Sequence, residues 1–87
     1  MGNLFLLDFD YFADKLLTDA ERNILNMIRI SLYIDSGKPR LHKVSYSISN
    51  LSAEQIIKQN FVLRRFMDKL NKDDEILSLQ EKLKIPM

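Results

Sequence analysis

Three aspartates near the N-terminus are the first residues in the chain whose type and spacing could support chemistry. Asp8, Asp10 and Asp14 follow a short apolar run over residues 4–7. Carboxylates gathered in this way can bind a hard cation, or act as nucleophile and acid in covalent catalysis. A calcium loop, however, needs a longer run of oxygen ligands and a glycine at its turn. Because this segment has neither, it does not predict a calcium site.

The order of these residues resembles the beginning of a haloacid-dehalogenase-type phosphatase, in which an apolar strand ends in Asp-x-Asp. Here residues 4–7 are followed by Asp8-Phe9-Asp10. The resemblance implies a first carboxylate that acts as nucleophile, a second that acts as acid and base, and a metal between them. Two departures argue against it: Phe12 stands where the family has a small hydroxyl residue, and 87 residues are too few for the complete domain. We therefore interpret Asp8 and Asp10 as helix-start charges.

Two further motifs fail on their own spacing. Ser36-Gly37-Lys38 lacks the first glycine of a phosphate loop, and Pro39 occupies the place of its hydroxyl residue. His42 is the only histidine and cysteine is absent, so neither a two-histidine nor a thiolate metal site can form within one chain. We predict that the protein is not an enzyme and has no cofactor, no metal site and no small-molecule substrate.

The composition predicts one folded domain over residues 1–87, in a reducing compartment. Apolar residues make up 46% of the chain and charged residues 29%, the balance of a globular domain. A secreted domain of this size would usually need disulfides, so the absence of cysteine predicts a cytoplasmic protein. No stretch is apolar for long enough to span a membrane.

Two capping boxes mark where helices begin. Thr18 with Glu21, and Ser52 with Gln55, each pair a hydroxyl with an acceptor three residues later, so that side chain and backbone can satisfy each other. Together with the apolar spacing, these signals predict a helix from about residue 9 with a break near Leu17, and further helices at about 52–71 and 74–84.

A hairpin over residues 29–48 connects the two helical regions. Residues 30–34 alternate as a strand does, although helical spacing continues from Ala20 through Ile24, Met27 and Ile28. Residues 35–39 form a break, and Val44 to Ser49 alternate again. We favour pairing across the break; residues 3–7 or a second copy of the chain are the alternative partners. The predicted fold class is α+β, mostly helical, with helices flanking a β-hairpin in a single small domain.

The helix at 52–71 has more apolar surface than one contact requires. Its predicted core arc consists of Ile56, Leu63, Phe66, Met67 and Leu70, and Ile57 and Phe61 fall outside it. The first twelve residues add more aromatic surface, although a chain of this size has a small interior. Exposed apolar surface usually marks a partner contact. The predicted protein-binding residues are Phe5, Phe9, Phe12, Ile57 and Phe61.

The middle of the chain is basic. Residues 38–72 hold eight basic and two acidic side chains, a net charge of +6, in a chain whose total is +1. Such clustering favours phosphate binding. The candidate nucleic-acid-binding residues are Lys38, Arg40, Lys43, Lys58, Arg65, Lys69 and Lys72.

Two functions follow from these patterns. The first is a small non-enzymatic regulatory or inhibitory protein that binds another protein and forms a homodimer, because apolar surface is plentiful and catalytic motifs are absent. The alternative is a DNA-binding transcriptional regulator that uses the basic surface in residues 38–72.

Overall fold

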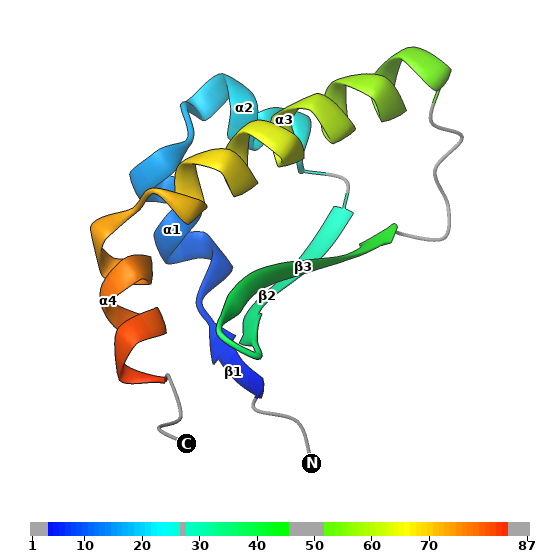
Figure 1. Cartoon of the computed structure of the whole chain (residues 1–87). Coiled ribbons are helices and arrows are strands. Elements are labelled where there is room, and N and C mark those ends of the chain that lie inside the picture. Colours follow the sequence, from blue (N-terminus) through cyan, green and yellow to red (C-terminus); the bar gives the residue numbers. More distant parts are fainter. Residues whose placement is uncertain (1–3, 27, 46–51, 84–87) are drawn as a thin grey trace.

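The computed structural model describes residues 4–26, 28–45 and 52–83, and it confirms the α+β class with helices flanking a hairpin. A three-stranded antiparallel sheet in the order β1-β2-β3 forms one layer, and helices pack on one face of it (Figure 1). The elements in chain order are β1 (Leu4–Leu7), α1 (Phe9–Leu16), α2 (Asp19–Ile24), β2 (Ile28–Asp35), β3 (Lys38–Ser45), α3 (Ala53–Asn71) and α4 (Asp74–Lys82).

The helix breaks lie where the capping signals predict them. Leu17 is extended, and Thr18 then opens α2 with both hydrogen bonds of a capping box to Glu21. Ser52 and Gln55 form the same reciprocal pair at the start of α3. Each box satisfies backbone N–H groups that a helix start would otherwise leave without a partner. The predicted break near Leu17 and both capping boxes are therefore confirmed.

The β2–β3 hairpin turns over only two residues. Ser36 and Gly37 have φ values of 53° and 81°, and two positive φ values in succession are the mark of the turn whose twist matches that of paired strands. The predicted break is therefore too long, because β3 already begins at Lys38 and contains Pro39. Proline is tolerated there since β3 is an edge strand and one side of it needs no ladder donors.

Strand β2 pairs on both sides. Leu32 lies opposite Leu41 of β3 and also opposite Leu7 of β1, so the hairpin and the pairing with the N-terminal segment coexist. The helical alternative for Ile28 is wrong, because β2 begins at that residue. The predicted strand residues 46–49 lie outside the described residues.

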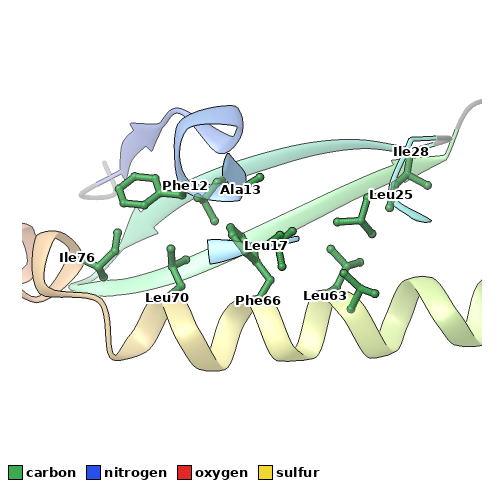
Figure 2. Packing of buried hydrophobic residues seen from close by; sticks show 11 residues of the cluster. Phe12, Ala13, Leu17, Leu25, Ile28, Leu63, Phe66, Leu70 and Ile76 are labelled. Atoms are coloured by element: carbon green, nitrogen blue, oxygen red, sulfur yellow. The ribbon is translucent and has the colours of Figure 1, made fainter. Parts of the chain in front are cut away.

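The core fills the space between α3, α1 and the sheet. Figure 2 shows Phe66 and Leu70 of α3 facing Phe12 and Ala13 of α1, with Ile76 of α4 closing one end. Phe66, Leu70 and Ile76 have no exposed surface. Leu63 is also buried and Met67 is partly so, as the helical spacing predicts, whereas Ile56 is 41% exposed and its prediction as a core residue is wrong.

Candidate functional surfaces

The first turns of α3 are exposed although they carry large apolar side chains. Every residue from 52 to 58 is exposed, and the first buried side chain of the helix is that of Gln59. Ile56, Ile57 and Phe61 are 41%, 67% and 62% exposed. Figure 1 shows this end of α3, in green, extending beyond α2. We call these three side chains the exposed α3 surface.

The exposed α3 surface has an apolar centre and polar edges. Ile57 and Phe61 are four residues apart and therefore lie next to each other on the helix. Lys58 pairs with Glu54 at 3.5 Å on one side, and Asn60 accepts a hydrogen bond of 3.1 Å from Lys43 on the other. An apolar patch surrounded by polar groups is the usual anatomy of a protein contact site.

The structure places two of the three predicted N-terminal rings in the core. Phe12 is only 4% exposed, and Phe9 is half-buried with its ring edge-on to that of Phe66 at 5.3 Å. Phe12 is buried and Phe9 is half-buried because α1 lies against α3, and residues three apart share one helix face. As partner-contacting residues, Phe12 and Phe9 are therefore corrected to core residues. Phe5 is 41% exposed at the sheet edge.

The seven predicted nucleic-acid-binding residues do not share one surface. Lys43 faces α3, where it contacts Asn60. Lys69 donates a hydrogen bond of 2.9 Å to the Leu16 carbonyl, and Arg65 lies 3.9 Å from Glu21. Lys58 pairs with Glu54, and Lys72 is an exposed C-cap residue of α3. Only Lys38 and Arg40 lie on the sheet face away from the helices, so the structure divides the set.

That sheet face forms a second candidate surface. Residues directly opposite each other in an antiparallel sheet project to the same side, and neighbours along a strand alternate. The register therefore puts the exposed side chains of Leu6, Arg40 and His42 on one face with the half-buried side chain of Tyr33. We call this the open sheet face; its described members are Leu4, Leu6, Arg29, Ser31, Tyr33, Asp35, Lys38, Arg40 and His42.

Sequence reasoning missed most of the open sheet face. Arg29, Tyr33 and His42 are not among the predicted site residues, because they are far apart in sequence and the pairing register was not known. The signal that could have found them is the period of two in residues 29–33, where the apolar residues on one side alternate with Arg29, Ser31 and Tyr33 on the other.

The N-terminal aspartates have structural roles. Asp8 caps α1 by accepting a hydrogen bond from the Tyr11 N–H, and Asp10 lies in the first turn. Asp10 and Asp14 both pair with Arg22 of α2. Asp8, Asp10 and Arg22 border an open polar cleft of about 860 Å³ between the start of α1, α2 and β2. Within residues 4–26, 28–45 and 52–83 no three His, Cys, Asp or Glu side chains are grouped to hold a metal ion.

An ion pair between Lys15 and the buried carboxylate of Asp73 joins α1 to α4. Lys15 lies 2.8 Å from Asp73, whose side chain is only 4% exposed, and 2.8 Å from Glu75. Burial would raise the pKa of Asp73, but the hydrogen bonds from Lys15 and from the Ile76 N–H outweigh this effect and lower the pKa. The hydrogen bond to Asp73 also raises the pKa of Lys15. Because Lys15 pairs with both carboxylates, we interpret this group as a structural link between α1 and α4.

Comparisons with known proteins give no match: no family model, no curated protein and no solved structure resembles this chain. None of the helices in the described part of the chain is both long enough and apolar enough to cross a membrane. The two exposed surfaces are therefore the features on which a functional proposal can be built.

Proposed function

We propose that this chain is a non-enzymatic protein-binding domain, of the regulatory or inhibitory kind, that docks through the exposed α3 surface. The observation that supports the proposal is the exposure of Ile57 and Phe61, at 67% and 62%, near the end of α3 at which every residue from 52 to 58 is exposed. Leaving these side chains in water forgoes about 25 cal/mol for each Å² of apolar area that a partner would cover.

The charges along α3 favour a second copy of the chain as the occupant, with the two helices antiparallel. A two-fold axis midway between Ile57 and Phe61 would put Ile57 of each copy against Phe61 of the other. It would also put Glu54, whose side chain is 79% exposed, at the level of Arg64 and Arg65 of the second copy. Parallel helices would instead oppose like charges, which is unfavourable.

Sedimentation velocity over a range of protein concentrations tests this proposal. The wild type is expected to form dimers, and the Ile57→Ser and Phe61→Ser variants are expected to remain monomeric with unchanged circular dichroism. Leu77→Ser is the matched control, because Leu77 is a 45% exposed apolar residue on α4, outside the proposed contact; this variant should dimerise like the wild type. The dimer should also melt at a temperature that rises with concentration.

Two outcomes would contradict the proposal. A wild type that stays monomeric at the highest concentration would exclude the second copy as the occupant. Equal loss of dimer in Leu77→Ser and Ile57→Ser would show that association does not depend on the exposed α3 surface.

The DNA-binding alternative is not carried by the seven residues that the sequence singles out, because five of them lie away from Lys38 and Arg40. A proposal that keeps only Lys38 and Arg40 of these seven residues, together with other residues of the open sheet face, is developed next.

A further inference from the structure

The open sheet face lies on the side of the sheet opposite the packed helices (Figure 1). The core side of the sheet carries Ile28, Leu32 and Ile34, each 7% exposed or less, whereas Leu6 on the open sheet face is 73% exposed. Arg29 and Arg40, also on the open sheet face, are exposed as well. Among the residues that the structure describes, most side chains of the open sheet face are therefore exposed, in contrast to those of the core side.

The open sheet face is positively charged. Arg29, Lys38 and Arg40 contribute three positive charges, and Asp35 is the one acidic side chain among its described members. In the described part of the chain, none of the three cations lies within ion-pair distance of a carboxylate, whereas Lys15, Arg22 and Lys58 all do. Its cations are therefore available for an external anion.

An apolar and aromatic row crosses the middle of this charged face. Leu6, Tyr33 and Arg40 lie directly opposite one another on the three strands. His42 lies opposite Ser31 in the next row, two residues along β3 from Arg40. A ring flanked by an apolar side chain and a guanidinium can stack a planar base, while cations at its side contact phosphates.

We propose that the open sheet face binds single-stranded nucleic acid, with a base stacked on Tyr33 and backbone phosphates at Arg29, Lys38 and Arg40. A duplex is the poorer fit, because its bases are already stacked and a flat face with Leu6 and Tyr33 at its centre would meet only its backbone. This site goes beyond the proposed function, since it lies on another element and uses none of the residues of the exposed α3 surface.

Fluorescence anisotropy with a labelled thymidine oligonucleotide tests the proposal. The wild type is expected to bind at low salt, with an affinity that falls steeply as salt rises, and to bind a duplex of the same length more weakly. Arg40→Glu should weaken binding by about tenfold or more. Its matched control is Lys72→Glu, the same change of charge on the exposed end of α3, which should bind like the wild type.

Variants of Tyr33 separate stacking from charge. Tyr33→Ala should lose about tenfold in affinity without changing the dependence on salt, because stacking involves no counterion release. Tyr33→Phe keeps the ring and should bind with nearly the affinity of the wild type. Circular dichroism of both variants checks that they are folded.

Three results would overturn the proposal. The first is no binding by the wild type at low salt. The second is equal weakening by Arg40→Glu and Lys72→Glu, which would indicate a diffuse charge effect. The third is a polyglutamate peptide that competes as well as the unlabelled oligonucleotide, which would assign the open sheet face to an acidic protein instead.

Discussion

The two halves of α3 have similar apolar content but very different surroundings. Residues 53–61 include four apolar side chains and residues 62–71 include five. In the second half, Phe66 and Leu70 are fully buried against α1 and the sheet, whereas Ile57 and Phe61 in the first half are more than 60% exposed. The difference comes from what lies beneath each half: α1 and α2 both pack against α3, and the first turns extend beyond them (Figure 1).

This comparison shows how one amphipathic pattern can serve two purposes. An apolar residue on a helix predicts that some surface will cover it, but it does not specify whether that surface belongs to the same chain. In this chain, the other helices and the sheet cover about half of α3. We infer that the second half stabilises the fold and that the first half is kept for a partner.

The largest expected difference is between the two phenylalanines. Phe66→Ala should lower the free energy of unfolding by about 3–5 kcal/mol, because it removes a fully buried ring and leaves a cavity. Phe61→Ala should change it by no more than about 0.5 kcal/mol, since the ring is mostly in water. Urea unfolding of both variants, at a concentration low enough to keep the protein monomeric, measures the contrast. Equal destabilisation would mean that both halves of α3 belong to the core.

The second difference concerns the helix caps near the two ends of α3. Asp73 follows the buried half, caps α4 and pairs with Lys15, so Asp73→Ala should cost about 1–2 kcal/mol in the free energy of unfolding. Ser52→Ala removes the cap of the exposed half and should cost about 0.5 kcal/mol, because fraying there breaks no core contact. Thermal unfolding of both variants compares them, and a larger loss in Ser52→Ala would contradict the account.

The third prediction is that the free energy of unfolding depends on pH through Asp73, which follows the buried half of α3. The pKa of Asp73 is lowered in the folded protein, so its contribution is present above its ordinary pKa of about 3.9 and is lost as pH falls through the lower, folded value. Glu75, whose pKa is lowered chiefly by the hydrogen bond from Lys15, acts in the same direction. Unfolding measured between neutral pH and pH 2 should show this loss, and Asp73→Asn should reduce it. If Asp73→Asn lost as much unfolding free energy at low pH as the wild type, other carboxylates would be responsible for the loss.

Local features of the fold could be predicted from the sequence because they depend on neighbouring residues. The capping pair Thr18 and Glu21 and the turn at Gly37 need only a few adjacent side chains. Pro39 shows the limit of this reasoning, since its acceptance in β3 depends on that strand having a free edge. Edge position is a property of the whole sheet and cannot be derived from the local sequence.

The candidate surfaces were predicted less completely, for the same reason. Ile57 and Phe61 fall outside the core arc of their own helix, so helical geometry alone predicts their exposure. The burial of Phe12 depends on α1 lying against α3, and the alignment of Leu6, Tyr33 and Arg40 depends on the register of three strands. Both are tertiary relations between segments that are distant in the chain.

The most direct test of the docking role of the exposed α3 surface is an isotope-filtered nuclear Overhauser experiment on a mixture of labelled and unlabelled protein, which detects only contacts between copies. The account predicts intermolecular contacts between the methyl groups of Ile57 and the ring of Phe61, with none at Phe66. Absence of intermolecular contacts at millimolar concentration, or contacts confined to Phe5 and the edge of β1, would contradict the claim that the first half of α3 pairs two copies of the chain.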